Sequence, residues 1–113
     1  MKNFNSIKKN IDFQNVYKNG KSYANKQLVM YILKNDKKVS RIGISVSKKV
    51  GNSVVRHRLA RLIRESYRLN RNMFNSGLNI IVLARTTAKG TDYAKIESAF
   101  LHLIRMHKIA LHI

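Results

Sequence analysis

The sequence contains no cysteine, which excludes disulfide bonds and thiolate metal sites. Short secreted domains usually depend on such cross-links, so their absence favours a reducing compartment. No segment approaches the roughly 18 consecutive apolar residues of a transmembrane helix. The polar start, MKNFNSIKKNIDF, also lacks the apolar stretch of a signal peptide. We therefore expect a cytoplasmic protein with no membrane partner.

Acidic residues are also scarce in this chain. It has 5 Asp and Glu residues against 23 Lys and Arg residues, which gives a formal net charge of +18 at pH 7. A surface of that charge repels itself, and a nucleic-acid backbone relieves the repulsion through counterion release. The charge balance therefore predicts a nucleic-acid partner. We expect no small-molecule substrate.

The few acids form no catalytic pattern. They are scattered along the chain at Asp12, Asp36, Glu65, Asp92 and Glu97. A protein nuclease would need paired carboxylates for metal ions, or a histidine placed as an acid or base. We therefore predict no catalytic residue, no metal site and no cofactor bound by the protein alone.

Hydrophobic residues make up 44% of the 113 residues, enough for one buried core, so we expect a single domain spanning residues 1–113. The apolar spacing predicts a short first helix with Asn10 as its N-cap and Gly20 as its stop. A strand at residues 27–34 and a polar turn follow, and a second strand at residues 41–47 would complete a hairpin.

The second half of the chain alternates helix, strand and helix. Residues 51–53 can cap a helix over residues 54–69, and the run at 78–84 is apolar on both faces, as in a central strand. A last helix would be capped by Thr91 and end near Leu111. This order predicts an α+β or split βαβ arrangement, with helices covering one face of a small mixed sheet.

The segment at residues 51–71, GNSVVRHRLARLIRESYRLNR, has the strongest functional pattern. At about 100° per residue, its apolar side chains fall on one face of a helix and its arginines on the opposite face and flanks. The apolar face holds Val55, Leu59, Leu62, Ile63, Ser66 and Tyr67. The outward set, here called the arginine ridge, holds Arg56, Arg58, Arg61, Arg64, Arg68 and Arg71.

The arginine ridge carries a local cost to folding, because like charges at i,i+4 destabilise a helix by a few tenths of a kcal/mol per pair. Guanidinium groups match phosphate oxygens and stack on bases, so we predict that the ridge binds a phosphate backbone. Lys48 and Lys49, just before the helix, would reinforce the phosphate attraction of its first N–H groups. A DNA major groove also admits such a helix, so a DNA-binding regulator remains an alternative.

Residues 45–65, SVSKKVGNSVVRHRLARLIRE, resemble the arginine-rich signature of the protein subunit of bacterial ribonuclease P. The segment DFQNVYKNGKSYANK resembles the first helix of that family and the stretch after it. Two positions depart from the signature, with His57 in place of the usual asparagine and Ala60 in place of a basic residue. We interpret His57 as a substitution at the solvent edge rather than as a metal ligand.

The resemblance implies an α-β-β-β-α-β-α two-layer sandwich with a left-handed βαβ crossover. It also implies two partners, a catalytic RNA subunit and precursor tRNA, whose 5′ leader is removed with Mg²⁺ held by the RNA. The residues that the resemblance assigns to the RNA subunit are Lys48, Lys49, Asn52, Arg56, Arg58, Arg61, Arg64 and Arg68.

The resemblance also implies a cleft for the single-stranded leader. Phe13 and Tyr17 share a face of the first helix, and Tyr31 points away from the core side of its strand. Unpaired bases stack on such rings for about 1–3 kcal/mol each. The expected leader-binding residues are Phe13, Tyr17, Tyr31, Ser45 and Ser47. Alternatively, Phe13 and Tyr17 simply pack the helix onto the sheet.

Two other classes of protein share part of this pattern. A structural RNA-binding protein of the ribosomal type could have the same charge, size and α+β fold, but it would not need the aromatic residues of a leader cleft. A DNA-binding regulator should dimerise and prefer duplex DNA.

Overall fold

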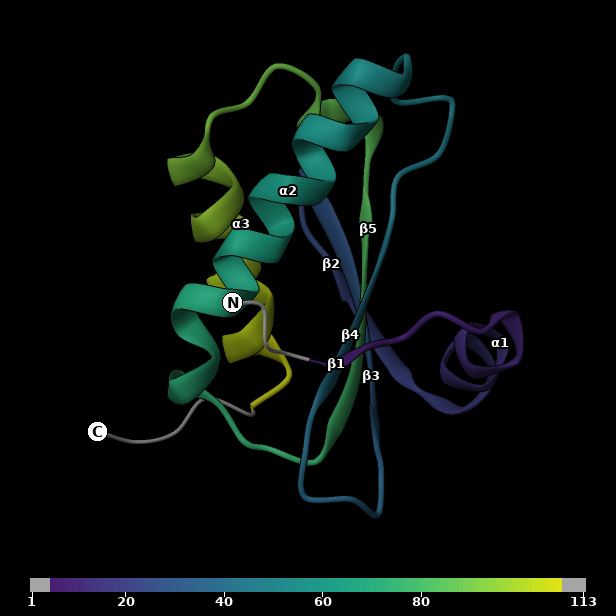
Figure 1. Ribbon diagram of the computed structural model, residues 1–113. Coiled ribbons are helices and arrows are strands. Elements are labelled where there is room, and N and C mark those ends of the chain that lie inside the picture. Colours follow the sequence, from purple (N-terminus) through teal and green to yellow (C-terminus); the bar gives the residue numbers. More distant parts are fainter. Residues whose placement is uncertain (1–4, 109–113) are drawn as a thin grey trace.

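The computed structural model describes residues 5–108, which form a five-stranded mixed sheet and three α-helices (Figure 1). The strands are β1 (Asn5–Ser6), β2 (Lys21–Ala24), β3 (Leu28–Lys34), β4 (Arg41–Ser45) and β5 (Leu78–Ala84). The helices are α1 (Asn10–Asn19), α2 (Ser53–Asn70) and α3 (Tyr93–Met106), with short 3₁₀ turns at Arg71–Met73 and Thr86–Ala88. The predicted α+β class and mixed sheet are confirmed.

Strand β5 lies at the centre of the sheet, whose order is β1-β4-β5-β3-β2. It pairs antiparallel with β3 and parallel with β4, and its residues Ile80, Ile81 and Val82 are fully buried. The predicted hairpin between β3 and β4 is therefore wrong. A strand that is apolar on both faces would expose one of them at an edge, and insertion between β3 and β4 buries both.

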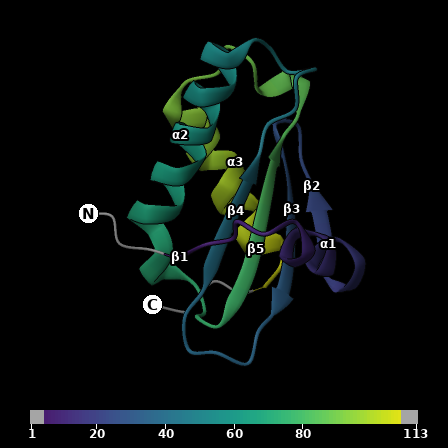
Figure 2. The same cartoon turned by 45° about the vertical axis from the view of Figure 1, so that its right-hand side comes forward.

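The connection from β4 through α2 to β5 joins two parallel neighbours. In Figure 2, β4 runs upward, β5 lies to its right and α1 lies in front of the sheet, so α2, on the opposite face, is on the side turned away from the viewer. This arrangement is a left-handed crossover, the rare hand for parallel strands. The left-handed crossover that the family resemblance implies is therefore present.

The helices lie on both faces of the sheet, α2 and α3 on one and α1 on the other (Figure 1). The prediction that helices cover one face therefore holds for α2 and α3 but not for α1. The main core lies under α2 and α3, where Leu59, Ile63 and Phe100 are fully buried. A smaller core under α1 is built from Ile7, Val16 and Ile81.

The element ends differ from several predictions. Helix α1 starts at Asn10, so Lys9 occupies the N-cap position and makes no side-chain capping bond. Helix α3 is capped by Asp92, whose side chain accepts a 3.0 Å hydrogen bond from the Lys95 N–H. Thr91 is not the cap, because its hydroxyl donates to the Ala88 carbonyl in the preceding turn.

Other differences concern the length of elements. Strand β4 ends at Ser45, because its partner β5 ends one residue past the Ser45–Leu83 pair, so Ser47 lies outside the sheet. Helix α3 ends at Met106 with His107 as its C-cap, so the expected end near Leu111 is five residues too late. The hydrophobic pattern did not predict β1 or β2. Only Tyr23 of β2 is partly buried, so that strand has no apolar alternation to detect.

Candidate nucleic-acid interface

Helix α2 holds its arginines on the outside of the molecule, because its opposite side is part of the core. Leu59, Ile63 and Tyr67 are buried against the sheet and α3. The helix is also well started, since the Asn52 side chain accepts a 3.0 Å hydrogen bond from the Val55 N–H. The two faces predicted for this segment are confirmed, and the ridge lies along a firmly packed helix.

Several members of the ridge have intramolecular partners. Arg56 donates from Nε to the Gly51 carbonyl at 3.3 Å, and Arg58 donates to the Thr91 carbonyl at 2.9 Å. These bonds restrict both side chains and leave donors free on each guanidinium group. Both groups are thus partly ordered before any partner binds.

Arg68 is paired with the only acid of the helix. Its Nε and one terminal nitrogen donate to the two Glu65 carboxylate oxygens at 2.6 and 2.8 Å. The hydrogen bond from Arg68 is the main reason that the pKa of Glu65 is lowered, and the same pair raises the pKa of Arg68. Glu65 therefore offsets the charge at one end of the ridge.

Arg61 and Arg64 differ from their neighbours. Both side chains are exposed, and within residues 5–108 neither makes a hydrogen bond or ion pair. Two unpaired guanidinium groups one turn apart on a rigid helix can each take a phosphate without breaking an internal bond. They are the members of the ridge most available to an anionic partner.

The turn before α2 presents Lys48 and Lys49 to solvent. It is closed by a 3.1 Å bond from the Val50 N–H to the Ser47 carbonyl, and the Val50 side chain is buried in the core. The next residue, Gly51, has to be a glycine because a Cβ at this position would lie 2.8 Å from the Val55 Cβ. This close approach brings the two lysines next to the start of the helix, where the N–H groups already favour negative charge.

A second group of predicted residues meets where α1 lies on the sheet. The rings of Phe13 and Tyr17 have centroids 6.2 Å apart, and those of Tyr17 and Tyr31 meet edge to face at 5.0 Å. All three side chains are half-buried. Burial raises the pKa of Tyr17, and the nearby Tyr31 adds to the shift. The rings pack α1 onto the sheet and still present part of their surface to solvent.

The small residues of β4 allow this packing. A Cβ at Gly43 would lie 2.8 Å from Cζ of Phe13, so only glycine lets the ring rest against the strand. Ser45, two residues on, lies on the same face of the sheet and is half-buried. Ser47 is exposed beyond the end of the strand. The structure thus brings Phe13, Tyr17 and Tyr31 together, with Ser45 on the adjoining sheet face.

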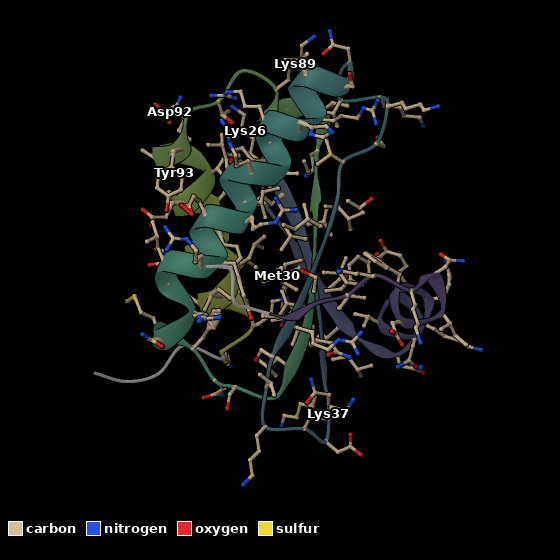
Figure 3. All side chains as sticks on the ribbon, viewed as in Figure 1. Lys26, Met30, Lys37, Lys89, Asp92 and Tyr93 are labelled. Atoms are coloured by element: carbon tan, nitrogen blue, oxygen red, sulfur yellow. The ribbon has the colours of Figure 1, made fainter. Side chains whose placement is uncertain are left out.

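The contact that fixes α1 against β4 has no signal in the sequence. Arg41 donates to Asp12 at 3.0 Å, and no local spacing relates these two residues. Arg41 also lines a basic hollow with Lys8, Lys9 and Lys37. Figure 3 shows that Lys37 lies at the end of the molecule opposite Lys89.

Four of the five acids make structural contacts. Asp12 pairs with Arg41, Asp92 caps α3, and Glu97 accepts hydrogen bonds from Asn70 and Tyr93. Within residues 5–108, no three His, Cys, Asp or Glu side chains are grouped as a metal ion would require. In the same part of the chain, no helix is both long and apolar enough to span a bilayer.

Comparison with known proteins decides between the classes that the charge pattern left open. The family model described as Ribonuclease P matches residues 1–108. The chain belongs to the ribonuclease P protein family. This membership supports the ribonuclease P interpretation over the ribosomal and DNA-binding alternatives, and it confirms the resemblance found in the arginine-rich segment.

Relatives in this family match almost the whole chain. The ribonuclease P protein component of Lachnoclostridium phytofermentans is 62% identical over 104 residues, covering 92% of this chain and 90% of the relative. That of Alkaliphilus metalliredigens is 51% identical over 109 residues, covering 96% and 98%. The chain is thus a protein component of ribonuclease P, the endoribonuclease that processes tRNA 5′ ends.

Solved structures of the family share the fold. The ribonuclease P protein of Staphylococcus aureus superposes with a TM-score of 0.87 at 40% identity, over 95% of this chain and 98% of that one. The protein from Thermotoga maritima superposes with a TM-score of 0.79 at 31% identity, over 84% and 90%. The chain and both solved proteins therefore have the same overall fold.

Proposed function

We propose that the arginine ridge binds the catalytic RNA subunit of ribonuclease P through its phosphate backbone. The observation that carries the proposal is the pair Arg61 and Arg64, two outward guanidinium groups with no hydrogen bond or ion pair in the described part of the chain. Arg56, Arg58, Lys48, Lys49 and Asn52 lie on the same helix or at its start and extend the surface. Arg68 contributes less, because Glu65 already holds it.

The half-buried rings beside α1 would hold the single-stranded 5′ leader of precursor tRNA. Phe13, Tyr17 and Tyr31 form a cluster of aromatic rings. The small side chain of Ser45 leaves space above the neighbouring sheet surface. Bases stack on such rings without sequence readout, which suits a leader that differs among tRNA genes. Ser47 would contact the leader just beyond the end of β4.

Magnesium ions would be held by RNA phosphates. The protein offers no grouped acids within its described residues, and the acids other than Asp36 make ion pairs, capping bonds or hydrogen bonds. The protein would contribute the positioning of substrate and the screening of phosphate repulsion.

Reconstituted cleavage of precursor tRNA tests this division of labour. We expect no cleavage by the purified protein alone. With the matching RNA subunit, the protein should lower the magnesium concentration needed for half-maximal cleavage, because its formal net charge of +18 replaces part of the screening by cations. The measurement is the initial rate over a magnesium series, with polylysine of equal total charge as the control. Cleavage by the protein alone, or an equal shift with polylysine, would contradict the proposal.

A further inference from the structure

The first half of the arginine ridge contains a hollow that is not purely cationic. It is lined by Ser53, Val54, His57, Arg58, Arg61 and Arg64. Val54 is 74% exposed, the highest exposure among the large hydrophobic residues of the described chain. A β-branched residue slightly lowers helix propensity, and here it gains no packing in return. Local folding therefore does not account for a valine at this position.

The residues of the hollow share one strip of α2. Val54, His57, Arg58 and Arg61 are spaced i, i+3, i+4 and i+7, so their side chains follow one another along the helix surface. At about 100° per residue, Val54 lies almost in line with Arg61, two turns nearer the start of the helix. The apolar side chain and the guanidinium group thus face the same way and can contact the same partner.

The chemistry of the hollow fits a nucleobase better than a phosphate. An unstacked base has an apolar face, and proteins hold such bases on histidine rings and on guanidinium planes. His57 supplies a ring and Val54 an apolar contact, while Arg58 supplies a guanidinium group fixed by its 2.9 Å bond to the Thr91 carbonyl. A site for phosphate alone has no use for an exposed valine.

We propose that this hollow takes one unpaired nucleobase of the RNA subunit, with the phosphates next to that base bound by Arg61 and Arg64. The inference rests on the proposed function and adds the kind of RNA feature that α2 recognises, a bulged or looped-out nucleotide rather than a regular duplex. His57 and Val54 become specificity residues, and Arg61 and Arg64 supply the ionic part of the affinity.

The net charge of the chain argues against a second copy of it as the molecule that occupies the hollow. Two molecules that each carry a formal net charge of +18 would bring their ridges together at the hollow. RNA instead provides an apolar base face flanked by phosphates, which is the complement of Val54 flanked by Arg61 and Arg64.

The experiment compares two RNA hairpins of one sequence, one fully paired and one with a single unpaired adenosine. Dissociation constants are measured over a potassium chloride series. The natural protein should bind the bulged hairpin about tenfold more tightly.

Val54→Thr, which keeps the branched shape, and His57→Ala should each remove most of that preference. Their lines of log affinity against log salt should stay parallel to that of the natural protein, because no phosphate contact is lost. His57→Phe should retain the preference, because it keeps a ring.

The outcomes separate this inference from the proposed function. Equal affinity of the natural protein for the two hairpins would contradict a base-binding site at the hollow. A change in the slope of log affinity against log salt for Val54→Thr would also contradict it. A dimer in RNA-free sedimentation that Val54→Thr dissociates would assign the hollow to a second copy and also overturn it. Failure of the proposed function would show elsewhere, as an RNA-subunit salt slope unaffected by loss of Arg61 and Arg64.

Discussion

Alanine at both Arg61 and Arg64 will weaken binding of the RNA subunit by about a hundredfold at moderate salt. It will also flatten the slope of log affinity against log salt by up to about two units. Both side chains are exposed and make no internal hydrogen bond or ion pair among the described residues, so their removal leaves the fold intact. The measurement is a filter-binding or fluorescence titration over a salt series.

The chain offers a control of equal charge. Lys95 and Arg105 are exposed on α3 and are not part of the ridge, and alanine at both also removes two positive charges. That variant should lose little affinity and keep the slope. Arg68→Ala, on the same helix, should have a small effect because Glu65 already engages Arg68. Equal losses in the α2 and α3 double variants would mean that net charge alone attracts the RNA.

Phe13→Leu will weaken binding of leader-bearing precursor tRNA by about tenfold to a hundredfold, while mature tRNA binds nearly as before. Leucine keeps an apolar side chain over Gly43 but removes the ring on which a base would stack. The measurement is the ratio of the two dissociation constants in the complex with the RNA subunit.

A packing role for Phe13 predicts a different pattern. In that case Phe13→Leu would lower the melting temperature and weaken both tRNA forms equally, because α1 would sit less firmly on the sheet. Val16→Ala is the comparison, since Val16 is fully buried under α1 and cannot contact RNA. It should destabilise the protein without changing the ratio of precursor to mature tRNA binding. Equal losses with Phe13→Leu would contradict a leader site at these rings.

The sequence predicted the ridge well because the ridge is a property of one helix. Helical spacing alone places Leu59 and Ile63 on one side and Arg61 and Arg64 on the other, and the structure has both. The same holds for Asn52, whose capping role follows from its place before the helix. Features that depend on one element were therefore predictable.

Features that depend on pairing between distant elements were not predictable from the sequence. The apolar run of β5 indicated a central strand, but nothing in the run says which strands flank it, so β3 and β4 were taken as a hairpin. The ion pair between Arg41 and Asp12 also joins distant elements. Such pairings are set by the total burial of the sheet and α1, which no local pattern records.

The aromatic cluster of Phe13, Tyr17 and Tyr31 was predictable only in part. Its members were identified from the face of α1 and from the alternation along β3, but their contacts depend on how α1 meets the sheet. The approach of Phe13 to Gly43 and the edge-to-face contact between Tyr17 and Tyr31 exist only in three dimensions. The sequence thus predicted the participants, and the structure adds that they pack α1 as well as facing solvent.

Directed hydroxyl-radical cleavage tests most directly whether the outward face of α2 meets RNA. Because the natural sequence has no cysteine, Ser53→Cys at the start of α2 gives a single site for an iron chelate. Asn19→Cys, exposed at the end of α1 on the other face of the sheet, gives a matched control. We predict strand cleavage in the RNA subunit from position 53 and little from position 19. Cleavage from position 19 alone would place the RNA on the wrong side of the protein and contradict the account.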